Sequence, residues 1–221
     1  MLNQIASRNV SSNQHGIHPD LLSTVNKHLQ KPYQKPVIEF NQAAFEQVKQ
    51  YYQHNKDHFI LDSGCGTGES TWHIAKAFPN SFVLGVDQSA DRIARNNPWQ
   101  LPGNARLIRA DLVDFWRLAI ASNWKLSRHY LLYPNPWPKK KHLQRRWHGH
   151  PVFPRIKDLG GKLELRTNWK IYGEEFSQAM TLQTDKATEL QVYLPDNPIS
   201  AFERKYQSSG QDLYQLKIDL D

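Results

Sequence analysis

The chain has 221 residues, of which 39% are hydrophobic, and a mean hydropathy of −0.70, values that fit one polar α/β domain. No apolar run approaches the roughly 20 residues of a membrane span, so the sequence predicts no membrane partner. The formal net charge of +7 favours a polyanionic partner such as nucleic acid, and the single cysteine, Cys65, excludes an internal disulfide and predicts a reducing, cytoplasmic location.

Residues 1–40 are predicted to form a polar arm, because they are rich in Ser, Asn, Gln and His. A short helix is predicted near residues 21–29 of this arm. Residues 41–221 are predicted to form one domain, which begins with a helix over residues 42–53. After that helix, strand-like runs at 59–62, 82–87, 105–110, 130–133 and 162–166 alternate with helix-like runs at 69–77, 90–96, 112–121 and 172–182.

This alternation predicts βαβ units, and hence a Rossmann-like α/β fold whose mostly parallel sheet has helices on both faces. Two late β-runs, 189–194 and 213–220, have no full helix predicted between them. They indicate an antiparallel hairpin at one edge. The predicted sheet therefore has seven strands.

A glycine-rich loop follows the first predicted strand, with the sequence Asp62-Ser-Gly-Cys-Gly-Thr-Gly68. Gly64, Gly66 and Gly68 allow a sharp turn and a close approach of the backbone to a ligand. In doubly wound sheets ligands bind at the carboxyl ends of the strands, where this loop is predicted to lie. The spacing GxGxG differs from the GxGxxG of dinucleotide-binding loops, which argues against NAD.

Acidic residues stand at the ends of the first three predicted strands: Asp62, Asp87 and Asp111. A carboxylate at the second strand end can accept hydrogen bonds from both hydroxyls of a ribose, and one at the third can accept from an adenine amino group. The three together suit a cofactor with an amino acid, a ribose and an adenine, which predicts S-adenosyl-L-methionine. No Cys/His group has metal-ligand spacing, so no metal is predicted.

A proline-stiffened loop follows the fourth predicted strand, with three prolines fixing φ in Tyr133-Pro-Asn-Pro-Trp-Pro138. Basic residues and tryptophans are concentrated in it and just after it: Trp137, Lys139, Lys140, Lys141, Arg145, Arg146 and Trp147. Cations interleaved with aromatic rings suit contacts with phosphates together with base stacking. The alternative, a solvated charged loop, does not account for the prolines and tryptophans.

This stretch resembles the PDPWPK-x-x-H-x-x-R-R signature of the tRNA (guanine-N7-)-methyltransferases, which are class I S-adenosylmethionine-dependent enzymes. Two later segments extend the resemblance: Gly160-Gly-Lys-Leu-Glu-Leu-Arg-Thr-Asn-Trp169 is similar to the GG…TDW strand, and Ser200-Ala-Phe-Glu-Arg204 with Gly210 to the T-x-F-E-x-R…G element. The resemblance covers roughly residues 55–221. It implies a class I methyltransferase, monomeric or homodimeric, that methylates a guanine in the tRNA variable loop.

The resemblance also implies a role for each matching position. Cofactor-binding residues would be Asp62, Gly64, Gly66, Gly68, Asp87, Asp111 and Asn135. Asn135 would also be the catalytic residue. Substrate-binding residues would be Lys139, Arg145, Arg146, Asn168, Ser200, Phe202 and Glu203. A glutamate can accept from both N1–H and the 2-amino group of guanine, so Glu203 is predicted to read the Watson–Crick edge.

The sequence departs from the family pattern at two carboxylates, because Asn135 and Asn168 stand where the PDPW and TDW motifs have Asp. The arm also has Ser12-Asn-Gln-His-Gly16 in place of an arginine-rich RRQGR-like segment. Guanine N7 has a free lone pair, so its methylation needs alignment and no general base. A nearby carboxylate would stabilise the positive charge that develops on the base. The two asparagines therefore predict weakened or redirected activity.

Two alternatives stay open at this stage. Asn135-Pro-Trp is similar to the (Asn/Asp)-Pro-Pro-aromatic motif of enzymes that methylate exocyclic amino groups of RNA or DNA. In those enzymes the asparagine oxygen accepts the amino hydrogens of the target base. The other alternative is a tRNA-binding paralogue with weakened catalysis, which both asparagines motivate.

Overall fold

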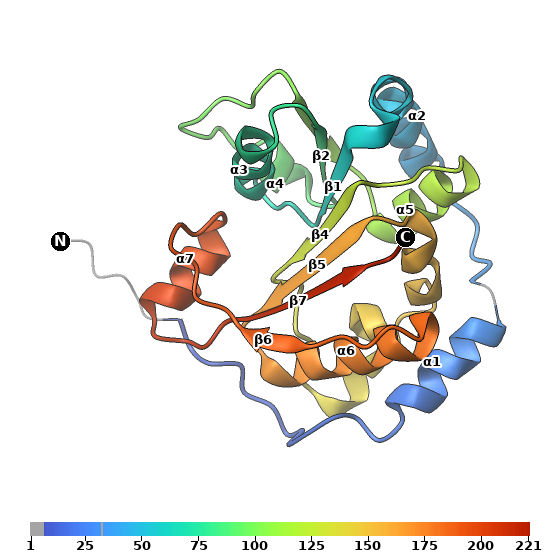
Figure 1. Cartoon of the computed structure of the whole chain (residues 1–221), viewed down its shortest axis with the longest axis vertical. Helices are drawn as coiled ribbons and strands as arrows, with labels where there is room; N and C mark the ends of the chain where they lie inside the picture. The colour runs from blue at the N-terminus through green and yellow to red at the C-terminus, as the bar shows by residue number, and fades with distance from the viewer. Residues whose placement is uncertain (1–6, 32) are drawn as a thin grey trace.

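The computed structural model describes residues 7–31 and 33–221. Its centre is a twisted seven-stranded sheet in the order β3-β2-β1-β4-β5-β7-β6 (Figure 1). The parallel strands are β1 (Phe59–Ser63), β2 (Phe82–Asp87), β3 (Ala105–Arg109), β4 (Arg128–Leu132) and β5 (Lys162–Thr167). The strand β7 (Tyr214–Asp219) is antiparallel to both β5 and β6 (Leu190–Val192). This topology confirms the predicted mostly parallel sheet with a C-terminal antiparallel pair.

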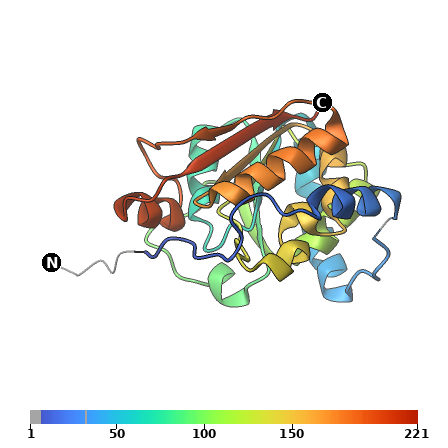
Figure 2. The ribbon, with the colours of Figure 1, turned by 90° about the horizontal axis from the view of Figure 1, so that it is seen from below.

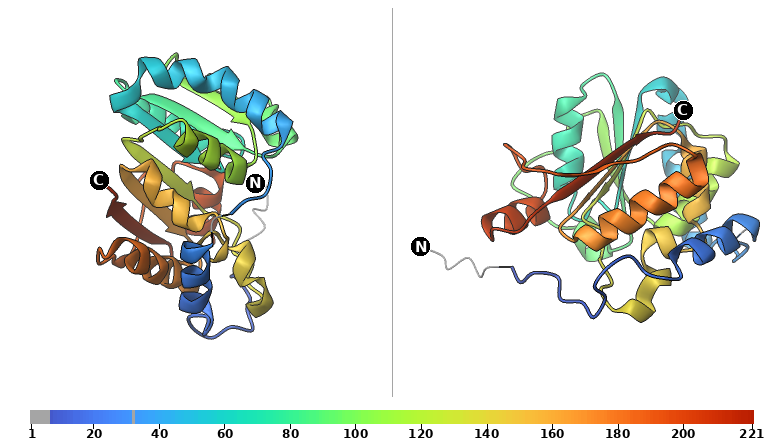
Figure 3. Two further views of the ribbon diagram at one scale, coloured as in Figure 1. Left: turned by 90° about the vertical axis from the view of Figure 1, so that its right-hand side faces the viewer. Right: turned by 60° about the horizontal axis from the view of Figure 1, so that its bottom comes forward.

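The sheet buries side chains on both faces, and alternate residues of one strand belong to different core clusters. Phe59 and Leu61 pack in the larger cluster, whereas Ile60 packs in the smaller one. The larger cluster contains side chains of α1 (Leu21–Gln30), α2 (Glu39–His54), α5 (Leu112–Ala121) and α6 (Lys170–Thr184). The smaller cluster contains side chains of α3 (Glu69–Ala77) and of α7 (Ala201–Ser208). Helices therefore cover both faces, as predicted, and Figure 3 shows the layers from two further sides.

Several predicted elements differ from the structure. The helix predicted over residues 90–96 is only α4 (Ala90–Ile93), and the strand predicted to reach residue 133 ends at Leu132 because Tyr133 has a φ of +50°. The absence of a full helix between the late strands was a wrong prediction, because α7 lies there. Ser200 caps α7 by accepting a hydrogen bond from the N–H of Glu203 at 3.2 Å.

The arm packs against the rest of the chain over the residues that the structure describes, while residues 1–6 lie outside them. Leu21 and Val25 of α1 are buried in the larger core cluster, which confirms the predicted helix near residues 21–29. The view from below shows residues 7–20 running beside α6 and the segment after β4 (Figure 2). The helix predicted over residues 42–53 begins earlier, at Glu39.

The connection from β4 to β5 folds as three short 3-10 helices, which the sequence did not predict. They are Lys140–Arg145, Trp147–Gly149 and Phe153–Leu159. The last of these places Phe153 and Ile156 in the larger core cluster. No helix within the described ranges is both long enough and apolar enough to cross a membrane.

Candidate active site

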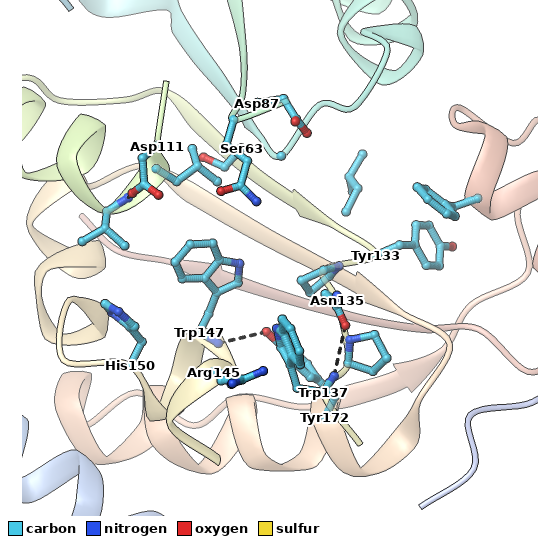
Figure 4. Close-up of a pocket in the computed structure, with 18 of the residues that line it drawn as sticks. Ser63, Asp87, Asp111, Tyr133, Asn135, Trp137, Arg145, Trp147, His150 and Tyr172 are labelled. Carbon is cyan, nitrogen blue, oxygen red and sulfur yellow. Dashed lines mark hydrogen bonds between the residues drawn. The ribbon is translucent and has the colours of Figure 1, made fainter. Parts of the chain in front are cut away.

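A cavity of about 540 Å³ lies at the carboxyl ends of the parallel strands (Figure 4). One wall comes from the ends of β1, β2 and β3, and includes Ser63, Gly64, Asp87 and Asp111. The opposite wall comes from the last residue of β4, Leu132, and from residues 133–137 after it, together with side chains from later segments. Those side chains belong to Arg145, Trp147, His150, Tyr172, Phe202 and Tyr206. The cavity thus joins the predicted glycine loop to the predicted proline loop.

The glycine loop turns through three left-handed residues, with φ of +81° at Gly64, +60° at Gly66 and +86° at Gly68. Gly64 lines the cavity, and the space in which a Cβ would lie is open there. At Gly68 a Cβ would instead clash with the side chain of Leu107. These positions need glycine for two reasons: access to a ligand at the first, and packing against β3 at the last.

Asp62 lies beneath the glycine loop and is not among the residues that line the cavity. Its Oδ2 accepts hydrogen bonds from the hydroxyls of Ser70 at 2.6 Å and Thr71 at 2.7 Å, which hold the first turn of α3. Burial raises the pKa of Asp62 to about 6, and its Oδ1 has no hydrogen-bond partner among the described residues. Asp62 therefore shapes the loop from below.

Asp87 lines the cavity and fastens the glycine loop to β2. Its Oδ1 accepts from the N–H of Ser89 at 2.8 Å, and its Oδ2 accepts from the N–H of Gly66 at 3.0 Å. Arg92, whose side chain is 47% exposed, forms an ion pair with the same Oδ2 at 3.1 Å. A ligand that binds to this carboxylate therefore competes with Arg92 for its lone pairs.

Asp111 lines the same wall and caps α5. Its Oδ1 accepts a hydrogen bond from the N–H of Val113 at 2.8 Å. The structure thus brings Gly64, Asp87 and Asp111 together in one cavity and places Asp62, Gly66 and Gly68 as their support. Cys65 is buried, and burial raises the pKa of its thiol well above the usual value. Packing in the turn is the role that this environment supports.

Part of the opposite wall belongs to a loop of residues 133–139, here called the acceptor loop. Tyr133 and Trp137 both have left-handed backbones, with φ of +50° and +45°, which side chains other than glycine rarely adopt. Asn135 lines the cavity, and its Oδ1 accepts a hydrogen bond from the N–H of Trp137 at 3.3 Å (Figure 4). The exposed guanidinium of Arg145 lies 4.7 Å from the centre of the Trp137 ring.

Two residues predicted to contact the substrate are buried and bound by the protein. Arg146 has no exposed surface and pairs with Glu175 at 2.6 Å. Glu203 is also fully buried, with Oε1 accepting from Tyr133 Oη at 2.8 Å and Arg166 Nη1 at 2.9 Å. The predicted contacts of Arg146 with RNA and of Glu203 with guanine are therefore not available in this arrangement.

The other predicted substrate residues lie in different surroundings. Phe202 is 50% exposed and lines the cavity, whereas Asn168 donates a hydrogen bond to Gln211 Oε1 at 2.8 Å and lies outside it. Ser200 serves as the cap of α7. Lys139 is exposed in a separate surface groove, whose walls include Lys140 and Ser12 of the arm.

Sequence reasoning missed several residues that line the cavity. Tyr206 stacks on Phe202, with ring centres 6.1 Å apart, and their spacing of four residues was the available signal for one helix face. Nothing in the local sequence singled out His150 or Tyr172. Within residues 7–31 and 33–221, no group of three or more His, Cys, Asp or Glu side chains is placed to hold a metal ion.

Comparisons with known proteins agree with this architecture. The family Methyltransf_4, described as "Putative methyltransferase", matches residues 56–216. The chain is 28% identical over 163 residues to a tRNA (guanine-N(7)-)-methyltransferase of Treponema pallidum, a match that covers 71% of this chain and 65% of that protein. A protein of the same name from Pseudomonas paraeruginosa is 28% identical over 174 residues, covering 72% of this chain and 69% of the relative.

The chain thus spans about two-thirds of the length of these curated relatives. Among solved structures, it is similar to a 16S rRNA (adenine(1408)-N(1))-methyltransferase from Catenulisporales acidiphilia with cosubstrate SAM. The TM-score is 0.54 at 15% identity, covering 80% of this chain and 92% of that one. This likeness shows the class I methyltransferase fold.

Proposed function

Because this chain belongs to the Methyltransf_4 family of methyltransferases, we propose that it transfers a methyl group from S-adenosyl-L-methionine to N7 of a guanine in tRNA. One observation carries the proposal: a single cavity joins the strand-end carboxylates Asp87 and Asp111 to a wall that combines Trp137 of the acceptor loop with the exposed side chains of Arg145 and Phe202. The variable loop of tRNA is the target that the sequence resemblance implies. The names of the similar proteins support tRNA as substrate.

The first wall of the cavity fits the proposed cofactor, which when bound supplies a methyl group on a sulfonium. Gly64 leaves open space beside its backbone, so the chain can approach a ligand there. Asp87 would accept the ribose hydroxyls, and Asp111 would accept the adenine amino group. Asp62 would act indirectly, by holding the turn between β1 and α3.

The acceptor wall fits a flat base whose reacting atom needs no deprotonation. Trp137 and Phe202 offer ring faces for stacking, and the exposed guanidinium of Arg145 can contact a phosphate. Guanine becomes cationic when N7 is methylated. Asn135 offers only a dipole there, and the carboxylate of Glu203 is already bound by Arg166 and Tyr133. We infer that aromatic faces supply part of the stabilisation of this charge.

The geometry at Asn135 disfavours the exocyclic-amino alternative. That reaction needs the side-chain oxygen of Asn135 to accept hydrogens from the target amino group. In the structure this oxygen accepts from the N–H of Trp137. The turn thus occupies one of the two lone pairs of this oxygen, whereas methyl transfer to N7 requires neither.

The test is a nucleoside profile of tRNA incubated with the purified protein and methyl-labelled S-adenosyl-L-methionine. Label in 7-methylguanosine is the expected result, and label on an exocyclic amine would replace the proposal with the alternative. Binding of cofactor and tRNA without incorporation would identify a paralogue that has lost turnover. The oligomeric state, monomer or homodimer, and the cytoplasmic location stay predictions from the sequence.

A further inference from the structure

We propose that Gln14 and Glu175 are positioning residues for the acceptor loop, and that they act on it through the buried guanidinium of Arg146. This inference rests on the proposed function, since it assigns these residues to the acceptor half of the same cavity. Gln14 comes from the arm, and Glu175 comes from α6. Neither residue is among those that line the cavity.

The acceptor loop needs support from outside itself. Tyr133 and Trp137 occupy left-handed backbone conformations that cost free energy in residues other than glycine. Such conformations persist only where surrounding contacts hold them. Because Trp137 lines the cavity, its backbone conformation sets where its ring meets an incoming base.

Arg146 supplies this support by binding carbonyl groups of the loop. Its Nε and Nη2 each donate to the carbonyl oxygen of Trp137 at 3.3 Å, and Nη2 also donates to that of Lys139 at 3.5 Å. The guanidinium lies 4.8 Å from the centre of the Trp169 ring, which closes it from one side. The strained residue is thus held by a fixed cation.

Glu175 fixes that cation and is saturated with donors. Its Oε2 pairs with Arg146 at 2.6 Å and with His148 Nε2 at 2.7 Å. Its Oε1 accepts from Gln14 Nε2 at 2.6 Å and from the N–H of His18 at 2.9 Å. We call these five residues the Glu175 cluster. Burial lowers the pKa of His148 and so favours its neutral form. With His148 neutral, the negative charge of Glu175 balances the positive charge of Arg146.

The arm takes part in this cluster through a side chain and not only through its backbone. Gln14 donates to Glu175 and accepts from Arg146 Nη2 at 3.0 Å, so one carboxamide bridges both charges. Ser12 donates to the carbonyl oxygen of Pro138 at 2.5 Å, and Asn13 Oδ1 accepts from the N–H of Lys140 at 3.2 Å. Consecutive arm residues therefore bind both the loop and the cation behind it.

Among the residues that the structure describes, no hydrogen bond or ion pair joins the cofactor wall to this cluster. Asp87 and Asp111 are held by backbone N–H groups of their own segments and of the glycine loop. A change at Gln14 should therefore alter the placement of the acceptor base and leave cofactor binding intact. A purely structural role would instead weaken both functions together.

The experiment compares Gln14→Ala with Gln30→Ala, an exposed glutamine at the end of α1. For Gln14→Ala we expect kcat for tRNA methylation to fall by about 10-fold to 100-fold, as for a displaced reacting group. The Kd for the cofactor, measured by calorimetry, should stay within about twofold of the wild-type value, because Gln14 shares no hydrogen bond with the residues of the cofactor wall. Glu175→Gln, with the neighbour variant Glu174→Gln as control, should reproduce the pattern if it folds.

A second readout is independent of activity. Exposed lysines stand at the end of the loop, at residue 139, and directly after it, at 140 and 141, so trypsin cleavage there reports how firmly the loop is held. Gln14→Ala should raise the cleavage rate about fivefold over Gln30→Ala, a rough figure for the loss of a buried hydrogen bond. Unchanged cleavage and unchanged kcat would overturn the inference, as would a parallel loss of cofactor binding. If the wild-type protein methylates no RNA but cleavage still responds, only the proposed function fails.

Discussion

The two walls of the cavity are built on different physical principles. The cofactor wall consists of strand ends and helix caps, where Asp87 and Asp111 accept from backbone N–H groups close by in sequence or in the sheet. The acceptor wall is a strained loop held by a buried ion pair between Arg146 and Glu175. One wall depends on local hydrogen bonding, and the other depends on long-range packing. Substitutions should therefore separate them.

The largest expected effect is on the support of the acceptor wall. Glu175→Ala leaves the guanidinium of Arg146 buried without its partner, so the free energy of unfolding should fall by about 3–5 kcal/mol. Urea unfolding followed by circular dichroism measures this change. The matched control is Glu174→Ala, whose pair with Lys170 at 3.6 Å is partly exposed and should contribute less than about 1 kcal/mol. Equal losses for both variants would contradict the comparison.

The same residue predicts a pH dependence of stability. Burial opposes ionisation of Glu175, but the hydrogen bonds from His148 and Arg146 outweigh it and lower its pKa from 4.5 to about 2. A depressed carboxyl pKa means stability that is fully present above pH 4.5 and lost as the pH falls toward 2. Thermal unfolding across this range should show a steeper decline for the wild type than for Glu175→Gln. Parallel slopes would remove Glu175 as the cause.

On the cofactor wall the largest effect is expected at Asp87. Asp87→Ala removes a charged acceptor, so the Kd for S-adenosyl-L-methionine should rise by about 10-fold to 100-fold. Calorimetric titration measures it, and the exposed Asp91→Ala on α4 controls for the change in charge. The trypsin sensitivity of the acceptor loop should not change. A loop that loosens in Asp87→Ala would show that the two walls are coupled.

A smaller effect is expected at Asn135. Asn135→Asp places a carboxylate beside the base, and because the residue is exposed the rate of methyl transfer should rise by only about fivefold or less. Single-turnover kinetics with tRNA gives this rate, and Asn197→Asp, an exposed asparagine before α7, is the matched control. An unchanged or lower rate would argue that this position does not limit the reaction through its charge.

The smallest effect is expected at Arg92. Its half-exposed side chain competes with a ligand for Asp87, so Arg92→Ala should tighten cofactor binding by about twofold. Arg95→Ala removes an equal charge from a nearby exposed position. Calorimetric titration of both variants and the wild type with S-adenosyl-L-methionine gives the three Kd values to compare. Weaker binding in Arg92→Ala would mean that Arg92 contacts the cofactor instead of competing with it.

The cofactor wall could be predicted from sequence because its determinants are local. An apolar strand, a glycine turn and an acid at the strand end are adjacent in the chain, and parallel topology brings such ends together. The acceptor wall could be predicted only in part. Arg145 and Arg146 look alike in sequence, yet one lies over Trp137 in the cavity and the other is buried against Glu175.

The two arginines differ because Arg146 has two partners that are distant in sequence. One is the carboxylate of Glu175, on a helix that begins 24 residues after Arg146, and the other is Gln14 of the arm, 132 positions before it. No pattern within the loop reports either one. The surroundings of Glu203 were missed for the same reason, since its partners are far from it in sequence: Arg166 on β5 and Tyr133 in the acceptor loop. The helix that carries it was missed because it is short and polar, and its only fully buried side chain is the charged Glu203.

The arm has a consequence for the order of folding. The N–H of Ser7 donates to Ser209, and Gln211 donates to the carbonyl of Ser7, contacts that span more than 200 residues. These contacts form only after α7 and the turn that follows it have been synthesised. The segment at Ser7 therefore docks only after most of the chain has been made, and the Glu175 cluster that Gln14 completes can close only once α6 has been synthesised. During synthesis, the cofactor wall can therefore form before the acceptor wall is complete.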